Sequence, residues 1–246
     1  MTEAIRATIR ERYDRFALRV LNGEGAFEST SRARAYFRSR KLNVALALGA
    51  LSPGSRVLEI GCSVGQFTFP LAERGYRMVG LDLSPGSIEL AKREAAQSGQ
   101  PSVEFLVGDA ENLSAFSDGA FDGVMSFSTL RYVPNFLNAL GEIHRVLRPG
   151  GMAVLDFPNR WCPWFYLKSW LGSERHPYDH WFSTESLARL FARAGFVNVR
   201  QRHLLFTPTV APDRLLPFFQ GADWVGERLP VVRRLAGIIM VAAEKG

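Results

Sequence analysis

The feature that most constrains the fold is a regular alternation of short apolar runs with helical segments, which begins at Arg56 and continues to the C-terminus. Glycine and proline turns separate the runs, which are short enough for strands. Such an alternation is typical of an open, mostly parallel sheet with helices on both faces. We expect seven strands, at Arg56–Ile60, Arg77–Asp82, Val103–Val107, Gly123–Phe127, Met152–Phe157, Val197–His203 and Ile238–Glu244, with helices at Gly65–Arg74, 84–96, Asn135–Leu147 and 184–194.

Residues 1–50 have a helical pattern that is interrupted at Asn22–Gly25. We therefore expect an N-terminal helical cap over residues 1–50, followed by one domain over residues 51–246 with inserts at 158–182 and 208–234. The net charge is +6, and many arginines lie near the N-terminus. No nucleic-acid recognition motif accompanies this charge, so we interpret it as a solvated helix face and expect no nucleic-acid partner.

Composition narrows the class of protein further. The chain is 47% hydrophobic but has no apolar run long enough to cross a membrane as a helix. Its N-terminus lacks the apolar segment of a secretory signal. The two cysteines, Cys62 and Cys162, suffice for neither a disulfide framework nor a metal site. A reducing, cytoplasmic setting and no metal ion are the expectations.

The first strand leads into a glycine turn between Gly61 and Gly65, and a helix follows. A strand that turns into a helix on glycines lets a ligand approach the backbone closely. Glu59 lies at the end of the strand, where its carboxylate would repel a pyrophosphate and attract a positive charge. S-adenosylmethionine (SAM) carries a sulfonium and an ammonium, so the turn favours SAM over a dinucleotide.

Two more carboxylates follow the next two strands. Asp82 ends the second strand, where a carboxylate can accept hydrogen bonds from both hydroxyls of a ribose. Asp109 follows the third strand and is suited to the exocyclic amine of an adenine. Because ligands of such sheets bind beyond the carboxyl ends of the strands, Glu59, Asp82 and Asp109 are expected around one ligand.

These motifs resemble those of the class I SAM-dependent methyltransferases, the broad group that includes the ubiquinone and menaquinone methyltransferases. The resemblance covers about residues 50–200 and the last strand, and it implies a Rossmann-like fold with SAM as cofactor. The segments that carry it are LEIGCSVG, LDLS, GDAENL, FDGVMSFSTLRYV and LRPGG.

The resemblance also implies roles for individual residues. The family usually has a glycine where this chain has Ser63; a positive φ there would strain the serine, and its hydroxyl is available to the cofactor carboxylate. By this resemblance, the methionine end of the cofactor contacts Glu59, Gly61 and Gly65. The ribose and adenine contact Asp82 and Leu83, and the adenine also contacts Asp109 and Ala110. Ser126 and Arg131 face the cofactor or the acceptor, and Tyr13 closes over the cofactor.

The segment from Pro158 to Phe182 holds four of the five tryptophans. We expect it to form either a lid over an apolar or ring-bearing acceptor or a small hydrophobic subcore. Methyl transfer from a sulfonium needs a base only where the nucleophile holds a proton. His176, His180 and Tyr132 are the candidates for that base.

The leading hypothesis is a SAM-dependent methyltransferase that acts on a small acceptor, on oxygen and without a metal. A nicotinamide-dependent oxidoreductase and a SAM-binding protein without catalysis are the alternatives, and RNA modification is suggested by charge alone. The turn lacks the third glycine of the dinucleotide fingerprint, which disfavours the oxidoreductase. We expect a monomer or homodimer, with the insert at 208–234 completing the pocket, meeting a second subunit or resting on a membrane surface.

Overall fold

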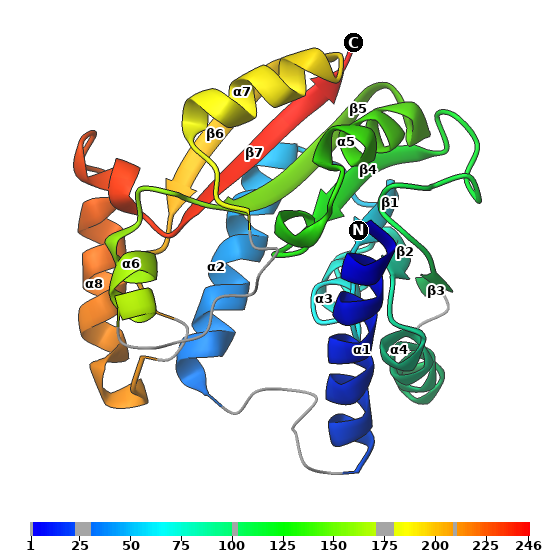
Figure 1. Ribbon diagram of the computed structural model, residues 1–246, viewed down its shortest axis with the longest axis horizontal. Coiled ribbons are helices and arrows are strands. Elements are labelled where there is room, and N and C mark those ends of the chain that lie inside the picture. The colour runs from blue at the N-terminus through cyan, green and yellow to red at the C-terminus, as the bar shows by residue number, and fades with distance from the viewer. Residues whose placement is uncertain (1, 23–30, 100–102, 171–179, 209–210) are drawn as a thin grey trace.

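The computed structural model describes residues 2–22, 31–99, 103–170, 180–208 and 211–246. A seven-stranded sheet in the order β3-β2-β1-β4-β5-β7-β6 forms its centre (Figure 1). Strands β1 to β5 are parallel, and β7 pairs antiparallel with both β5 and β6, which confirms the predicted open, mostly parallel sheet. The strands are β1 Arg56–Ile60, β2 Arg77–Asp82, β3 Val103–Val107, β4 Phe121–Ser126, β5 Leu147–Pro158, β6 Phe196–Leu204 and β7 Ile238–Lys245.

Helices cover both faces of this sheet, as Figure 1 shows. Alternate residues of each strand face opposite cores: Val57 and Met78 pack on the side of α2 and α3, whereas Leu58 and Val79 pack on the side of α5 and α7. A strand buried on both faces reads as a continuous apolar run, which is why these strands were detectable in the sequence. The helices are α2 Arg32–Gly49, α3 Thr68–Ala72, α4 Pro85–Ser98, α5 Phe136–Val146 and α7 Thr184–Arg193.

Local signals set the ends of several helices. Ser84 caps α4 by accepting from the Ser87 amide (3.0 Å), Pro85 occupies the first turn, and Gly99 ends the helix in the left-handed conformation. Ser183 and Ser186 form a capping box at the start of α7. These caps explain why both helices begin within a residue of the predicted positions.

Two of the predicted elements begin three or more residues away from the predicted position. Strand β5 begins at Leu147, so it includes the residues expected to form a turn at 148–151; Leu147 pairs with Phe121, and the register then shifts before Met152 pairs with Gly123. Helix α3 starts only at Thr68, because the backbone between residues 61 and 65 takes positive φ angles.

The two N-terminal helices pack against the rest of the chain. Asp14 of α1 (Thr2–Leu21) accepts from the Ser84 hydroxyl (2.6 Å) and from the Gly86 amide (3.1 Å), so α1 docks at the N-terminus of α4. In α2, Leu42 and Ala45 belong to the same buried cluster as β1 and β7 residues. The division into a cap and a main domain stays a prediction.

The C-terminal insert contributes helix α8 (Leu216–Gly226), which also attaches to α2. Asp223 is buried and accepts from the Tyr36 hydroxyl (3.0 Å), and Glu227 pairs with Arg40. Phe218 is 72% exposed on the outer side of α8, as are several other apolar side chains nearby. Contact of this insert with a second subunit or a membrane surface stays a prediction. Among the described residues, no helix combines the length and apolar character needed to cross a bilayer.

The chain order reverses between β1 and β4, which are neighbours in the sheet. From β1 the chain proceeds outward to β2 and β3, and from β4 it proceeds the other way to β5. Open parallel sheets bind ligands beyond the strand ends at such a reversal. The site should therefore lie where the turn after β1 meets the loop after β4.

Candidate functional site

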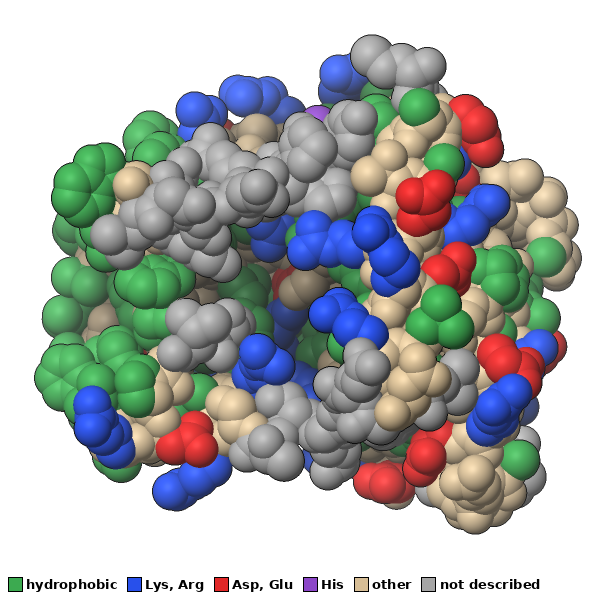
Figure 2. Space-filling model, turned by 60° about the horizontal axis from the view of Figure 1, so that its bottom comes forward, with side chains coloured by type: hydrophobic (Ala, Val, Ile, Leu, Met, Phe, Trp, Pro, Cys, Tyr) green, Lys and Arg blue, Asp and Glu red, His purple; other side chains and the backbone are tan. Residues whose placement is uncertain are grey.

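A cavity of about 350 Å³ lies at this reversal. Its walls come from the ends of β1, β2, β3 and β4 and from the N-terminal helices α1 and α2. Figure 2 shows a hollowed face of the molecule with lysine and arginine side chains around the hollow, and Arg6, Arg38 and Lys41 line the cavity itself. The volume is in the range of pockets for small molecules.

The turn after β1 forms the floor of the cavity. The Gly61 and Cys62 amides both donate to the Leu81 carbonyl, at 2.7 and 3.1 Å, so the turn bends back over β2. Gly61 has a φ of +76°, and a Cβ on it would lie 2.0 Å from Thr129 Oγ1 in the loop after β4. The turn therefore needs glycine at residue 61 both for its backbone conformation and for close packing.

Ser63 takes a φ of +50°, which is the left-handed conformation that would strain a serine. For a residue with a Cβ this conformation costs about 1 kcal/mol. The Ser63 amide donates to Asp82 Oδ2 at 2.8 Å, which holds the turn in this conformation. Ser63 lines the cavity, so its contact with the cofactor stays a prediction with the geometry in its favour.

Asp82 ends β2 and faces the cavity with a fixed carboxylate. Oδ2 accepts from the Ser63 amide and Oδ1 accepts from the Ser84 amide at 2.9 Å. Burial raises the pKa of Asp82, against the lowering effect of these backbone bonds. The backbone bonds fix the orientation of the carboxylate, which keeps capacity to accept a donor from the cavity.

Asp109 follows β3 and is tied to helix α1. Arg6 forms an ion pair with Asp109 Oδ2 at 2.6 Å and another with Glu111 Oε2 at 3.1 Å. The other Asp109 oxygen accepts from the Glu111 amide at 2.9 Å. Asp109 and its neighbour Ala110 both line the cavity. The two ion pairs of Arg6 hold α1 against the loop that carries them.

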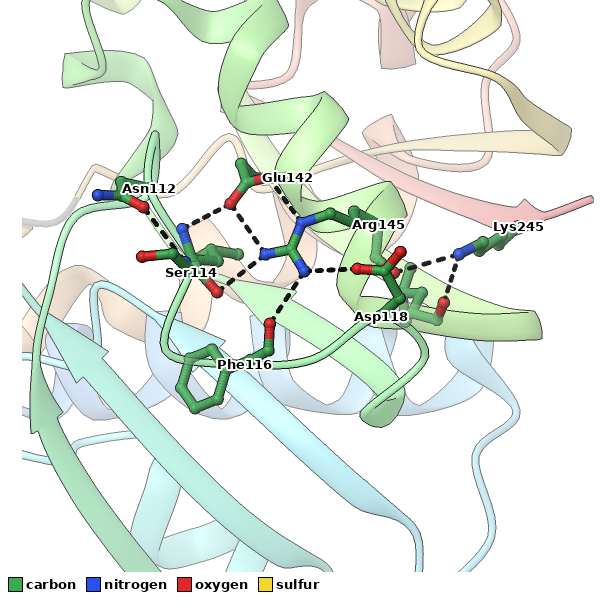
Figure 3. A network of polar contacts seen from close by, with 9 residues as sticks. Asn112, Ser114, Phe116, Asp118, Glu142, Arg145 and Lys245 are labelled. Atoms are coloured by element: carbon green, nitrogen blue, oxygen red, sulfur yellow. Dashed lines mark hydrogen bonds and ion pairs between the residues drawn. The ribbon is translucent and has the colours of Figure 1, made fainter.

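Helix α5 supports the loop that carries Asp109 and Ala110. Figure 3 shows Arg145 at the centre of this support: it donates to the Leu113 and Phe116 carbonyls at 2.9 Å each and contacts Asp118 and Glu142. Glu142 in turn accepts from the Leu113 amide at 2.7 Å. One guanidinium thus holds the loop in a single conformation.

Replacement of Arg145 with methionine is therefore expected to lower the free energy of unfolding by about 1–3 kcal/mol, because two carbonyls and two carboxylates lose their donor. The variant should also bind the cavity's ligand more weakly, since the loop beside Asp109 becomes looser. Urea denaturation and calorimetry measure the two effects. Arg93→Met is the matched control, since Arg93 is exposed and pairs with Glu89 of the same helix. An equal loss in both variants would contradict the role of Arg145.

Glu59 lies beneath the turn rather than in the cavity. Its side chain is fully buried, and the Thr68 hydroxyl donates to its Oε2. Burial raises the pKa of Glu59 to about 8, so the carboxyl is mostly protonated at neutral pH. A contact of Glu59 with the methionine end of the cofactor stays a prediction.

Three further predicted contacts lie outside the described lining of the cavity. Gly65 packs against Phe69, whose ring would be 2.5 Å from a Cβ at residue 65. Ser126 is buried, and its hydroxyl donates to the Ile60 carbonyl at 2.8 Å, which ties β4 to β1. The Arg131 guanidinium stacks over the Tyr132 ring at 5.2 Å. The predicted contacts of these three residues with the cofactor or the acceptor stay predictions, and the lining does include Tyr13 and Leu83.

Among the candidate bases, Tyr132 lines the cavity. His180 is exposed and outside the lining, and its amide donates to the Arg131 carbonyl at 3.0 Å. His176 lies outside the described residues. In the described part of the aromatic insert, the Trp181 ring contacts the rings of Phe165 and Tyr166. No described residue of the inserts at 158–182 and 208–234 lines this cavity, and completion of the pocket by either insert stays a prediction.

The aromatic surface of the cavity comes instead from α1, α2 and two turns. Its rings belong to Tyr13, Phe16, Phe37, Phe67, Phe127 and Tyr132. Sequence reasoning missed Phe37, Lys41 and the buried Asp156 behind Lys41. The available signals were a lysine on the apolar side of a helix and one aspartate in the otherwise apolar run Met152–Phe157.

Known proteins resemble this chain in both sequence and fold. A sequence profile described as a methyltransferase domain matches residues 58–155, from β1 into β5. The demethylmenaquinone methyltransferase of Beutenbergia cavernae is 34% identical over 179 residues, which cover 64% of this chain and 72% of that protein. The ubiquinone biosynthesis O-methyltransferase of Cereibacter sphaeroides is 29% identical over 163 residues, which cover 63% of this chain and 65%, less than two thirds, of that protein.

Among solved structures, the chain is similar to phosphoethanolamine N-methyltransferase 2 of Haemonchus contortus in complex with S-adenosyl-L-methionine. The TM-score is 0.64 at 19% identity, and the match covers 84% of this chain and 52% of that one. This likeness shows a shared fold, whereas the sequence relatives show the family. Taken with the turn at Gly61 and the carboxylate of Asp82, they establish that the chain belongs to the class I SAM-dependent methyltransferases, with SAM as its cofactor.

Proposed function

We propose that this methyltransferase acts on a small acceptor with an apolar or ring-bearing body, and that it methylates an oxygen atom without a metal ion. The observation that carries the proposal is the two-part cavity: carboxylates and a glycine turn line one end, and the rings of Phe37, Phe67 and Phe127 line the other. The relative named as a ubiquinone biosynthesis O-methyltransferase supports oxygen as the methylated atom.

The residues at the first end fit the cofactor. Asp82 offers two oriented carboxylate oxygens, which suit the two ribose hydroxyls. Leu81, Leu83 and Ala110 supply apolar walls for the adenine ring, with Asp109 at its edge. The backbone of the turn after β1 can approach the methionine part closely, because residue 61 has no side chain.

When bound, SAM supplies a methyl group that its sulfonium has already activated for displacement. The work left to the protein is alignment and exclusion of water. Tyr13 and Phe16 of α1 line the cavity, and the ion pair between Arg6 and Asp109 holds that helix in place. Of the predicted bases, Tyr132 lines the cavity, which supports it as the candidate.

Calorimetry with SAM and S-adenosylhomocysteine tests the proposal first. Asp82→Asn is expected to weaken binding of both by about tenfold to hundredfold, because hydrogen bonds to a charged group contribute about 1.5–3 kcal/mol. Glu104→Gln, an exposed change on β3, should leave binding unchanged. Transfer of a labelled methyl group to a panel of phenols then tests the acceptor class. Equal binding by wild type and Asp82→Asn, or transfer to amines instead of phenols, would overturn the proposal.

A further inference from the structure

A buried ion pair lies in the wall at the aromatic end of the cavity. Lys41 of α2 is 2% exposed and Asp156 of β5 is 3% exposed, and their side chains pair. The Lys41 ammonium also donates to Ser128 Oγ at 2.7 Å, and Asp156 Oδ1 accepts from the Ser128 amide at 2.5 Å. A buried ion pair contributes little net stability because both charges lose their water. Its presence beside a ligand cavity therefore calls for a functional reason.

The orientation of the pair is specific. Lys41 and Ser128 line the cavity, whereas Asp156 does not, so a ligand meets the cation and the carboxylate stays behind it. Ser128 takes a φ of +59°, a strained conformation that its bonds to Lys41 and Asp156 hold in place. Strained residues of this kind concentrate at ligand sites.

Besides Ser128 and Asp156, three aromatic rings surround the ammonium. The Lys41 Nζ lies 5.3 Å from the centroid of the Phe37 ring, 5.7 Å from that of Phe67 and 5.8 Å from that of Phe127. Phe67 and Phe127 stack on each other at 4.1 Å. An ammonium has three donors; here one goes to Ser128 and one faces Asp156. The third can serve a single oxygen atom of a ring-bearing ligand.

The position along the sheet places this group beyond the cofactor end. Asp82 ends β2, whereas Ser128 and Asp156 lie at the ends of β4 and β5, two and three strands away. At the usual strand spacing, this separation is about 10–14 Å. Lys41 therefore stands on the acceptor side, with the turn at Gly61 between it and Asp82.

We propose that Lys41, held by Asp156 and Ser128, binds the ionised oxygen of a phenol or enol acceptor. The proposal rests on the proposed function and narrows its acceptor class. One available donor in an apolar pocket fits one oxygen better than the two of a carboxylate. Arg38 also lines the cavity and adds a second cation there, so an anionic oxygen is favoured over a cationic group. The proton of the acceptor leaves to solvent on binding.

The test uses para-nitrophenol, whose ionised form absorbs visible light, on the whole protein saturated with S-adenosylhomocysteine. Wild type is expected to bind the ionised form preferentially, so the pKa of the bound probe falls below its value in buffer. Para-nitroanisole, which cannot ionise, should bind more weakly. Because this readout needs only the unmodified protein, it decides the proposal even if a variant does not fold. An unchanged or raised pKa of the probe in wild type would overturn it.

The matched variant is Lys41→Met with Asp156→Asn, which keeps the shapes and an acceptor for the Ser128 amide while removing both charges. It should bind the phenolate about tenfold to hundredfold more weakly and para-nitroanisole as wild type does. Lys92→Met, on the exposed side of α4, should change neither. Equal phenolate binding by the double variant, or tighter Lys41-dependent binding of para-nitrobenzoate, would overturn the phenol subsite. Failure to bind S-adenosylhomocysteine in the first place would instead overturn the proposed function.

Discussion

Replacement of Gly61 with alanine is expected to abolish measurable SAM binding and to destabilise the protein by about 2–4 kcal/mol. The new Cβ would lie 2.0 Å from Thr129 Oγ1 and 2.3 Å from Thr129 Cγ2. Either the turn after β1 or the loop after β4 must then move, and both form the floor of the cavity. The amide contacts of the turn with the Leu81 carbonyl would shift with it. Calorimetry and thermal unfolding measure the two losses.

Gly54→Ala is the control that separates the two causes. Gly54 has a φ of +88°, close to the +76° of Gly61, but a Cβ on Gly54 would have no atom within 4 Å. Gly54→Ala therefore reports the cost of the backbone conformation alone, about 1 kcal/mol, with SAM binding unchanged. If Gly61→Ala lost no more stability than Gly54→Ala and still bound SAM, the close approach of Thr129 would not constrain the turn.

The cofactor end could be predicted from the sequence because its signals are local. Strand, turn and carboxylate follow one another within a few residues, and the parallel sheet then brings Asp82 and Asp109 to one edge. The positive φ of Ser63 also follows from a local rule, since a residue in a glycine position of the turn inherits its backbone conformation.

The acceptor end could not be predicted in this way, because it depends on how α2 packs. Lys41 contacts Ser128, which is 87 residues away in the sequence, and Asp156, which is farther away still. No local sequence pattern predicts such a contact. The aromatic composition of residues 158–182 predicted either a lid or a subcore, but composition does not say which element covers a site; of the described rings, Phe182 is buried and Trp161 and Trp170 are exposed. The Trp181 and Phe165 rings contact each other, and the rings of the cavity come from earlier segments.

The second large effect is expected from Glu59→Gln, and its size should depend on pH. In the unfolded chain this carboxyl ionises near its ordinary pKa of 4.5, whereas burial raises the folded-state pKa to about 8. Between these values the folded protein retains a proton that the unfolded chain has lost, so stability falls as the pH rises. The stabilising contribution is complete below pH 4.5, and its loss by pH 8 is on the order of 4 kcal/mol.

Glutamine cannot ionise, yet its side-chain oxygen can still accept the hydrogen bond of Thr68. Relative to wild type, Glu59→Gln should therefore gain stability steadily from pH 5 to pH 8, and the other titrating groups cancel in the difference. Urea denaturation of both proteins at several pH values measures it, with the exposed change Glu104→Gln as the control. A difference that stays constant with pH would mean that Glu59 is already ionised in the folded protein. The carboxylate beneath the turn would then carry the negative charge that the sequence alone suggests for it.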